Sequence, residues 1–381
     1  MANDSRTNLN DLEIYLKLQE HLNKVTICFP HSKSGVEIRL LKYLFTPKEA
    51  KIATMLKFAW KELETLENIF ERAKHLGYTI EELEECLDRM ARKGAIMALK
   101  KGKTKTYGNA NFIVGMADYQ VNKLTKEFVK DSKKYLYEAY LMDLGKITIP
   151  QTRIIPIEQK IEPDFGIINY DDFKDIFDKS EPPYMVTNCV CRQGCDILGQ
   201  PCKITTRREV CISFGHAAQR YIEQGWGRQI TKEETLEILK KNHNDGLIHQ
   251  INNAQKPDFI CSCCTCCCEG LKILKSLPNP GDLIKSNYYA QIDPELCKGC
   301  GTCIDHCQME AISVKDEIST ILKKRCIGCG YCINICPTEA IRLHKKDTLY
   351  VPPLTGKELY EEIIKIKEKI VKRELKRSSK K

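Results

Sequence analysis

The stretch CKGCGTCIDHC at residues 297–307 recurs as CIGCGYCINIC at residues 326–336, shifted by 29 residues (326 − 297). Both copies have the spacing C-x2-C-x2-C-x3-C. Thiolates are soft ligands for iron, and the x2 steps let three sulfurs of one loop reach three corners of an iron–sulfur cube. The repeat therefore predicts two [4Fe-4S] clusters, with ligands among Cys297, Cys300, Cys303, Cys307, Cys326, Cys329, Cys332 and Cys336.

Glycines recur in phase with these cysteines, at Gly299, Gly301, Gly328 and Gly330. A residue without a Cβ lets backbone N–H groups turn toward the cluster sulfides, where hydrogen bonds stabilise negative charge. Such hydrogen bonds raise the reduction potential of a cluster. We therefore expect these glycines to take part in cofactor binding.

The segment from Ile292 to Leu343 resembles the bacterial two-cluster ferredoxins, including Ala311-Ile312 and Ala340-Ile341, where a strand starts after each run. The resemblance implies that the fourth cysteine of each run binds the other cluster. One cluster would then be held by Cys297, Cys300, Cys303 and Cys336, and the other by Cys326, Cys329, Cys332 and Cys307.

Gln308 departs from this resemblance, because it stands where Pro337 follows the fourth cysteine of the second run. Ligation should survive this change. The alternative interpretation is a zinc ribbon built on the same C-x2-C pairs. A zinc ion needs only four thiolates and no third x2 step, so the pattern favours the clusters.

Compartment and membrane contact follow from the rest of the composition. The chain has 21 cysteines, and its N-terminus leads into a charged helical pattern without the apolar region of a signal peptide. There is also no run of about 18 apolar residues that could cross a bilayer. We expect a cytoplasmic protein without membrane insertion, whose cysteines bind metals and form no disulfides.

The net charge of the chain bears on whether its partner is a nucleic acid or a protein. The formal charge is +9, but each oxidised cluster with its four thiolates carries about −2, which leaves +9 − 4, or about +5. This balance is too weak to indicate nucleic acid by itself, and it suits docking onto an acidic redox partner protein. No Gly-x-Gly-x-x-Gly motif or P-loop supports a nicotinamide or nucleotide site.

We expect an α+β protein of several domains, because 381 residues leave room for them and the uneven distribution of cysteines marks their boundaries. Cys28 and Cys86 alone precede residue 189, and their apolar neighbours indicate small core residues. The expected parts are an N-terminal helical segment (1–35), a winged-helix-like domain (36–119), a helical linker (120–150), a cysteine-rich central α/β domain (151–285), a ferredoxin domain (286–350) and a basic C-terminal helix and tail (351–381).

Residues 36–119 resemble the winged-helix family. A helix at 38–45 is followed by two capping boxes, Thr46-Pro47-Lys48-Glu49 and Thr79-Ile80-Glu81-Glu82, each of which opens a helix. A β-hairpin is expected from 95–99 and 112–114, with its turn at 101–103.

DNA binding would place the third helix in the major groove and lysines of the wing on phosphates. Acidic residues crowd the N-terminal half of that helix, however, and repel phosphates. DNA therefore remains a possible partner that the sequence does not favour. The acidic residues are Glu81, Glu82, Glu84, Glu85 and Asp88, and the lysines are Lys100, Lys101, Lys103 and Lys105.

The central domain is expected to begin with strands at 154–157 and 185–187 around a helix at 171–178. Its first cysteines are Cys189, Cys191, Cys195, Cys202 and Cys211. A C-x-C pair can chelate one ion only from an irregular loop, since residues two apart in a strand lie far apart. Arg192, directly after this pair, would offset thiolate charge and donate hydrogen bonds. The alternative is a set of unliganded thiols.

A second and denser run precedes a predicted helix at 269–276. If the run itself is helical, its sulfurs fall on two faces, which predicts two centres, or one centre and a reactive thiol pair. A reducing cytosol gives no reason to crowd oxidisable thiols unless something binds them. The run contains Cys261, Cys263, Cys264, Cys266, Cys267 and Cys268.

The order of these features resembles a family of iron–sulfur proteins from anaerobes: a winged-helix start, a C-x-C-R block, the dense cysteine run and a C-terminal dicluster ferredoxin. The resemblance implies a shared ligand set for the central site, with Cys195 as an extra residue. We expect one or two further Fe-S clusters or a metal ion there. The implied set is Cys189, Cys191, Cys202 and Cys211.

The sequence thus predicts an oxygen-sensitive electron-transfer protein, in which single electrons pass between the C-terminal clusters, the central centre and a redox partner. It indicates no catalytic residue. Two alternatives stay open: a redox-responsive winged-helix transcription regulator, and a thiol or disulfide reductase in which Cys263 or Cys264 reacts directly. Near the C-terminus, Leu359, Ile363, Ile366 and Ile370 recur at helical spacing among basic residues, which predicts a basic amphipathic helix that docks on the body of the protein or on a partner.

Overall fold

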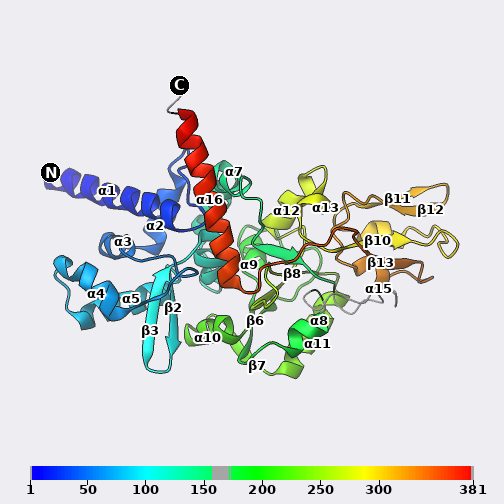
Figure 1. The fold of residues 1–381 in the computed structure, drawn as a ribbon, viewed down its shortest axis with the longest axis horizontal. Coiled ribbons are helices and arrows are strands. Elements are labelled where there is room, and N and C mark those ends of the chain that lie inside the picture. The colour runs from blue at the N-terminus through cyan, green and yellow to red at the C-terminus, as the bar shows by residue number, and fades with distance from the viewer. Residues whose placement is uncertain (1, 157–170, 172, 379–381) are drawn as a thin grey trace. The chain divides into compact units, whose positions relative to one another are not determined.

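A computed structural model describes residues 2–156, 171 and 173–378. The chain forms two compact units (Figure 1). The first unit comprises residues 1–149 and 360–381, and the second comprises residues 150–359. The expected central and ferredoxin domains therefore belong to the same unit. None of the helices in the described ranges is long and apolar enough to cross a membrane.

The first unit is mainly helical, with one small antiparallel sheet of order β1-β3-β2. After α2, the main helices and strands follow one another along the chain in the order α3, β1, α4, α5, β2 and β3. The elements are α1 (Ala2–Val25), α2 (Val36–Leu44), α3 (Pro47–Ala53), β1 (Glu64–Thr65), α4 (Leu66–Ala73), α5 (Ile80–Lys93), β2 (Ile96–Lys101), β3 (Thr104–Asn109), α6 (Lys126–Tyr135), α7 (Leu141–Leu144) and most of α16 (Gly356–Ser378).

Both predicted capping boxes are confirmed. At the start of α3, the Glu49 N–H donates to the Thr46 hydroxyl at 3.3 Å, and the Glu49 carboxylate accepts from the Thr46 N–H at 2.8 Å. At the start of α5, Thr79 and Glu82 make the same pair of bonds at 3.2 and 2.9 Å. Each box satisfies two N–H groups that a helix N-terminus otherwise leaves without partners.

The predicted hairpin is present, but its second strand was placed wrongly. Strand β3 pairs with β2 from Thr104 opposite Lys101 to Asn109 opposite Ile96, so the ladder ends before Phe112. Residues 112–114 form an irregular turn in which Val114 has φ 57°. Phe112 is fully buried and packs against the rings of Phe29 and Tyr135. Phe112 is thus apolar because it is buried in a helical core. A short apolar run of this kind cannot be told from a strand by sequence alone.

Three cations of α5 and the hairpin, Lys105, Arg89 and Lys93, are paired with carboxylates. Lys105 of the hairpin lies 2.9 Å from Glu84 and 2.7 Å from Asp88 of α5. Arg89 and Lys93 lie 3.0 and 2.7 Å from Glu49, which is fully buried. These acidic partners lower the positive potential of α5 and the hairpin.

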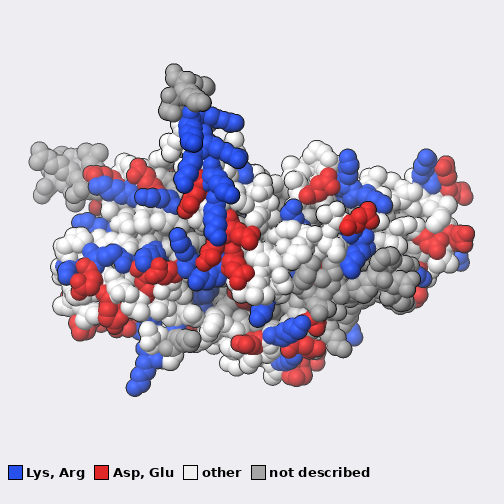
Figure 2. All heavy atoms as spheres, in the orientation of Figure 1, with Lys and Arg blue, Asp and Glu red and all other residues white. Residues whose placement is uncertain are grey.

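The C-terminal helix α16 packs on the first unit through its apolar face. Ile363 is fully buried, and the Tyr360 ring stacks on Trp60 at 4.6 Å. Lys367 donates to the carbonyls of Thr26 and Asn23 at the end of α1. Figure 2 shows Lys and Arg side chains gathered along α16 toward the C-terminus. The predicted amphipathic, basic helix is confirmed.

The second unit is built on an antiparallel sheet of order β4-β8-β9-β6-β5-β7. The strand expected at 185–187 and the helix expected at 171–178 are found at Tyr184–Asn188 and Phe173–Asp178. The strand expected at 154–157 was placed too late along the chain, because it runs from Thr152 to Ile154, and residues 157–170 and 172 lie outside the described residues. The elements are β4 (Thr152–Ile154), α8 (Phe173–Asp178), β5 (Tyr184–Asn188), α9 (Val190–Ile197), β6 (Glu209–Phe214), α10 (Gly215–Glu223), β7 (Arg228–Ile230), α11 (Lys232–Asn244), β8 (Ile248–Asn252), β9 (Phe259–Cys263), α12 (Glu269–Ser276) and α13 (Pro280–Leu283).

The two cysteine repeats follow this sheet in the same unit. Each repeat ends in a short helix and is followed by a strand, as the repeated sequence predicts. Strand β10 pairs with β13, and β11 pairs with β12, both antiparallel. These elements are β10 (Tyr288–Ile292), α14 (Thr302–His306), β11 (Ile312–Lys315), β12 (Ile318–Ile321), α15 (Tyr331–Asn334) and β13 (Ile341–Lys345).

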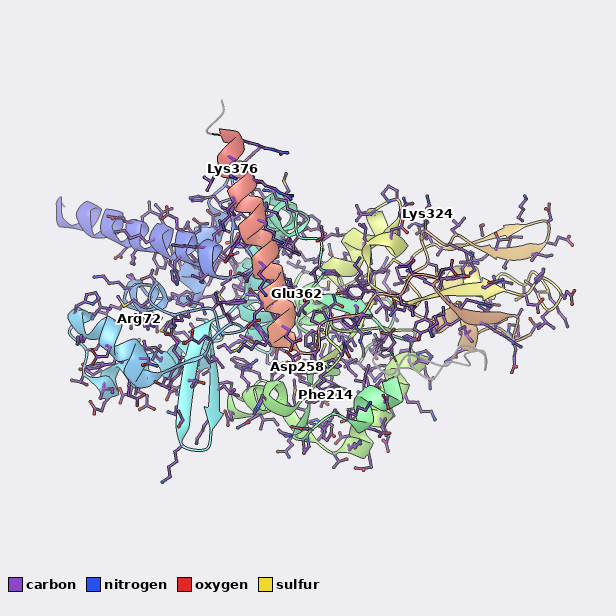
Figure 3. The ribbon with its side chains drawn as sticks, in the orientation of Figure 1. Arg72, Phe214, Asp258, Lys324, Glu362 and Lys376 are labelled. Carbon is purple, nitrogen blue, oxygen red and sulfur yellow. The ribbon has the colours of Figure 1, made fainter. Side chains whose placement is uncertain are left out.

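Asp258, before β9, gives the second unit a pH-dependent stability. The N–H of Phe214 donates to its carbonyl at 2.9 Å (Figure 3), and its buried Oδ1 has no hydrogen-bond partner among the described residues. Burial raises the pKa of Asp258 to about 6, against the charge of Arg220. The folded state thus favours the protonated acid. Its contribution to stability is full below the unfolded pKa of about 3.9 and is lost as pH rises through about 6.

We therefore expect Asp258→Asn to stabilise the second unit at pH 8 and to change its stability little at pH 5. Anaerobic urea unfolding of both proteins at the two pH values measures this difference. Asp282→Asn, at an exposed carboxylate, is the control and should behave like the parent at both pH values. An equal effect of Asp258→Asn at both pH values would contradict the assignment.

Candidate metal centres

The glycines of both repeats have the backbone geometry that their positions require. Gly299, Gly301, Gly328 and Gly330 all have positive φ, between 64° and 77°. A Cβ on Gly299 would lie 2.0 Å from the carbonyl oxygen of Glu317, and one on Gly328 would lie 2.3 Å from that of Tyr288. Glycine is therefore required at these two positions both by conformation and by the close approach of a second chain segment.

Cys307 of the first repeat lies with three cysteines of the second. One pocket is lined by Cys307, Cys326, Cys329 and Cys332 together with apolar side chains such as Ile248. Burial, together with the neighbouring charges of Cys307 and Cys326, raises the pKa of Cys329 to about 12. Thiols with raised pKa values in an apolar pocket need a metal to hold them as thiolates.

Backbone N–H groups point at several of these sulfurs. The N–H of Ala311 donates to Cys307 at 3.3 Å, and that of Ala340 donates to Cys336 at 3.3 Å. The N–H of Ala290 donates to Cys326 at 3.4 Å. Such bonds favour anionic sulfur, so this donor set fits an iron–sulfur cluster. The first two are equivalent positions of the repeat.

The central cysteines form two groups, and the larger is a closed ring. Thiol–thiol hydrogen bonds connect its members in the order Cys189, Cys191, Cys268, Cys263, Cys261, Cys211 and back to Cys189. We call these residues the six-cysteine ring. Cys189 and Cys268 are the N-cap residues of α9 and α12, so two helix N-termini add positive potential.

The hydrogen bonds of the ring lower the pKa of alternate members. A bond from the Cys211 thiol, followed by one from Cys263, lowers the pKa of Cys261 to about 5 despite burial. Cys189 and Cys268 have lowered pKa values for the same reason, with Cys191 as their strongest partner. The same bonds raise the pKa of Cys191, Cys211 and Cys263, so thiolate character falls on three of the six sulfurs.

The second group is tighter. Cys202 lies 3.6 Å from Cys264 and 3.7 Å from Cys266, and Cys266 lies 3.4 Å from Cys264 and 3.7 Å from Cys267, all between sulfurs. The four sulfurs all lie within 4.8 Å of one another. We call Cys202, Cys264, Cys266 and Cys267 the compact site. Cys195 hydrogen-bonds to Cys267 at its edge.

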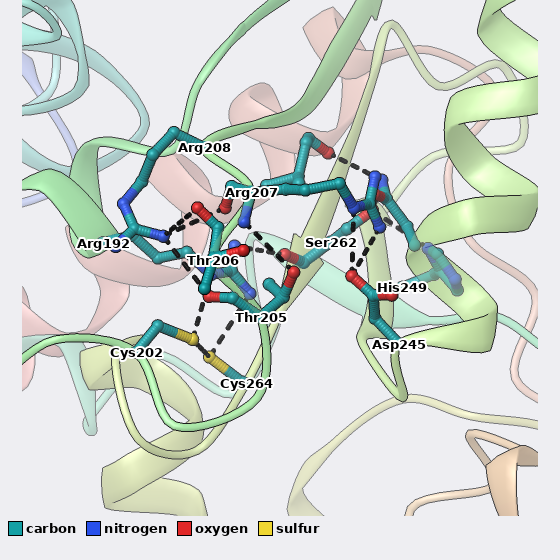
Figure 4. A network of polar contacts seen from close by, with 12 residues as sticks. Arg192, Cys202, Thr205, Thr206, Arg207, Arg208, Asp245, His249, Ser262 and Cys264 are labelled. Atoms are coloured by element: carbon teal, nitrogen blue, oxygen red, sulfur yellow. Dashed lines mark hydrogen bonds and ion pairs between the residues drawn. The ribbon is translucent and has the colours of Figure 1, made fainter.

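Arg192 is fully buried against the compact site (Figure 4). Its Nε lies 3.4 Å from the Cys202 sulfur, one terminal nitrogen lies 3.3 Å from the Cys264 sulfur, and the other donates to the Ser262 carbonyl at 2.9 Å. A hydrogen bond from Cys267 and the charge of Arg192 lower the pKa of Cys264 to about 5, against burial. The expectation that Arg192 offsets thiolate charge agrees with this geometry.

The four central cysteines that the resemblance implies as one ligand set are divided between the two groups. Cys189, Cys191 and Cys211 are neighbours in the six-cysteine ring, whereas Cys202 belongs to the compact site. The supposition that the dense run is helical was wrong, because Cys261 and Cys263 lie on strand β9 and a turn follows before α12. The helix at 269–276 begins and ends as predicted.

The sequence analysis did not predict the buried polar side chains that hydrogen-bond to Ser262 of β9. Ser262 faces away from its two cysteine neighbours, accepts or donates a bond at 3.2 Å with the buried His249, and accepts one from Asn242 at 2.8 Å. The alternation of Cys261-Ser262-Cys263 was a signal for this, because side chains of a strand alternate between faces. His216, five residues after Cys211 in the sequence, is exposed at the start of α10.

Gln308 connects the first repeat to the dense cysteine run. Its Oε1 accepts from the N–H of Thr265 at 2.8 Å, and its Nε2 donates to the carbonyl of Gly246 at 2.6 Å. Thr265 lies between Cys264 and Cys266 of the compact site. The departure from proline thus supplies two hydrogen bonds that proline cannot make.

Comparison with known proteins supports the C-terminal part. Residues 290–343 match the family model of the 4Fe-4S dicluster domain. The match covers both cysteine repeats and the strands that flank them, and it indicates iron–sulfur electron transfer and redox partners in general. No curated protein and no solved structure is detectably similar to the chain.

Proposed function

We propose that the protein is a multi-cluster iron–sulfur electron carrier. The observation that carries this proposal is a shared apolar core, in which Cys263 of the six-cysteine ring packs with Cys303 and Cys326 of the two repeats. Cys261 and Cys268 of the ring pack against the same core. Redox centres bound at these positions would border the same apolar core.

We propose crossed ligand sets for the two C-terminal [4Fe-4S] clusters. The pocket shared by Cys307 with Cys326, Cys329 and Cys332 supports one set. The pKa of Cys303 is raised by burial and, to a smaller extent, by the charges of Cys300 and Cys336, and the closeness of these three sulfurs supports the other set. The glycines at 299, 301, 328 and 330 would bind through their backbone. The second set is Cys297, Cys300, Cys303 and Cys336.

We propose that the six-cysteine ring holds a further iron–sulfur cluster. Each bound cluster supplies a one-electron carrier, so electrons would pass between the repeats, the ring and a redox partner protein. The chain contributes the thiolates, the N–H groups directed at them and an apolar core that excludes water. Both the lowered pKa of Cys261 and the helix N-termini at Cys189 and Cys268 favour the charged ligands.

We propose a winged-helix arrangement for the first unit. The element order α3, β1, α4, α5, β2, β3 and the sheet order β1-β3-β2 support it. Its role would be to position a protein partner, because the ion pairs of Lys105, Arg89 and Lys93 with acidic residues disfavour duplex DNA. Salt-dependent binding of duplex DNA at low ionic strength would point instead to a transcription regulator.

Metal and sulfide analysis of protein prepared without air tests the proposal. We expect about twelve cluster irons per chain, eight in the C-terminal repeats and about four in the ring, with equal sulfide. Electron paramagnetic resonance of the reduced protein should show interacting clusters. A colourless protein with zinc or no metal in the repeats would overturn the proposal. About eight irons per chain would show that the six-cysteine ring holds no cluster.

Loss of the Gln308 side chain is expected to loosen the junction between the first repeat and the dense run. In Gln308→Ala, the N–H of Thr265 and the carbonyl of Gly246 lose their partners, which should lower the free energy of unfolding by about 1–3 kcal/mol. Anaerobic urea unfolding measures the change. Gln308→Glu is the control, because it keeps the acceptor for Thr265 and should retain part of the stability. Equal stability of Gln308→Ala and the parent would contradict this role.

A further inference from the structure

The compact site differs in kind from the other sulfur groups. We propose that Cys202, Cys264, Cys266 and Cys267 bind one mononuclear metal ion, Zn²⁺ or Fe²⁺, as a tetrathiolate, and that this ion is no part of any iron–sulfur cluster. Three of these ligands come from the turn between β9 and α12, and the fourth comes from the loop after α9.

Sulfur–sulfur distances carry the argument. Four Zn–S bonds of about 2.3 Å in a tetrahedron place the sulfurs about 3.8 Å apart. The measured separations in the compact site are 3.4, 3.6, 3.7 and 3.7 Å. A [4Fe-4S] cube would hold its thiolates much farther apart, since each thiolate binds a different iron and the inorganic cube lies between them. The site is therefore too small for a cube.

The buried guanidinium of Arg192 indicates negative charge on the sulfurs around it, which include two of the compact site. Arg192 is 0 % exposed, and two of its nitrogens lie against the sulfurs of Cys202 and Cys264 (Figure 4). A buried cation without an anionic partner costs several kcal/mol, so neutral thiols could not hold it. Four thiolates and one divalent ion carry −2, and Arg192 reduces this to −1. The four thiolates and the neighbouring Arg192 thus fit a divalent metal ion bound by four sulfurs.

The six-cysteine ring is wider than the compact site. Among the described residues, only the four sulfurs of the compact site all lie within 4.8 Å of one another, so no three ring sulfurs do. Cys263 and Cys268 of the ring immediately flank the turn that holds Cys264, Cys266 and Cys267. One ion in the compact site would therefore fix this turn and orient two ligands of the ring. Its role would be structural, apart from electron transfer.

Metal and sulfide content distinguishes an ion from a cluster. Cys266→Ala, at a partly exposed ligand, is expected to lose about one zinc or one iron per chain and no acid-labile sulfide. Cys195→Ala is the matched control, because Cys195 lies beside the site without being one of the four ligands, and it should keep the ion. Loss of iron and sulfide in equal amounts from Cys266→Ala would overturn the proposal, and so would unchanged metal content.

X-ray absorption at the zinc edge of the unaltered protein keeps the proposal testable if Cys266→Ala does not fold. We expect about four sulfurs at about 2.3 Å and no iron neighbour. If the zinc content is below one ion per chain, the iron content should exceed the sulfide content by the remainder. Equal iron and sulfide without zinc would overturn the proposal. Either outcome is independent of the electron-carrier function, which rests on the clusters of the repeats.

Discussion

Cys307→Ala is expected to abolish the cluster bound by Cys326, Cys329 and Cys332 and to spare the cluster bound by its own repeat. The reason is geometric, since Cys307 lines the same pocket as these three cysteines. An iron–sulfur cube that loses one of its thiolates becomes labile. We expect a loss of about four irons and four sulfides per chain, measured on protein purified without air.

Double variants show which cluster is lost. If Cys307 and Cys329 bind the same cluster, Cys307→Ala combined with Cys329→Ala loses no more iron than either variant alone. Cys307→Ala combined with Cys300→Ala should instead lose about eight irons, because both clusters lack a ligand. Cys336→Ala gives the reciprocal pattern and serves as the matched control. The opposite pairing in the double variants would show that each repeat binds its cluster without crossing.

Gly299→Ala is expected to prevent stable assembly of the first repeat. A Cβ at this position would lie 2.0 Å from the carbonyl oxygen of Glu317, which belongs to the backbone between β11 and β12 and cannot rotate away. The positive φ of 64° adds about 1–2 kcal/mol of strain. Together with the clash, which costs about 1–3 kcal/mol, this should lower the free energy of unfolding by about 2–5 kcal/mol.

Gly301→Ala separates the two causes. Gly301 has φ 77°, but nothing lies within 4 Å of the position of its Cβ. This variant should therefore lose only the conformational part, about 1–2 kcal/mol. Anaerobic urea unfolding, followed by the loss of visible cluster absorbance, compares the two. Equal destabilisation would show that the approach of Glu317 makes no contribution at Gly299.

Local signals were sufficient for many elements. The helices that start at Pro47 and Ile80 follow capping boxes, whose hydrogen bonds join residues only three apart. The α12 helix was predicted from its own residues. The dicluster domain was predicted from the repeated cysteine spacing, in which the cysteines are themselves the expected ligands. Each of these features depends on neighbours within one turn or one loop.

Predictions failed where long-range packing decided the conformation. Phe112 resembles a strand residue, but it is held among aromatic rings from distant helices. The dense cysteine run resembles a helix, but its first part pairs as β9 with β6 and β8. Strand pairing adds hydrogen bonds with segments that a local pattern does not contain, so it can override a helical spacing.

The sequence by itself determined the chemistry of this protein: soft thiolate ligands, their repeated spacing, the glycines beside them and the arginine after the C-x-C pair. Only the tertiary structure decided how the central cysteines are shared. Cys202 joins the compact site, whereas Cys211 joins the six-cysteine ring. The physical reason is that the direction of a sulfur depends on the strand, turn or helix cap that carries it and on the distant segment it meets. Spacing along the chain determines which cysteines can share a loop, and packing determines which of them share a metal.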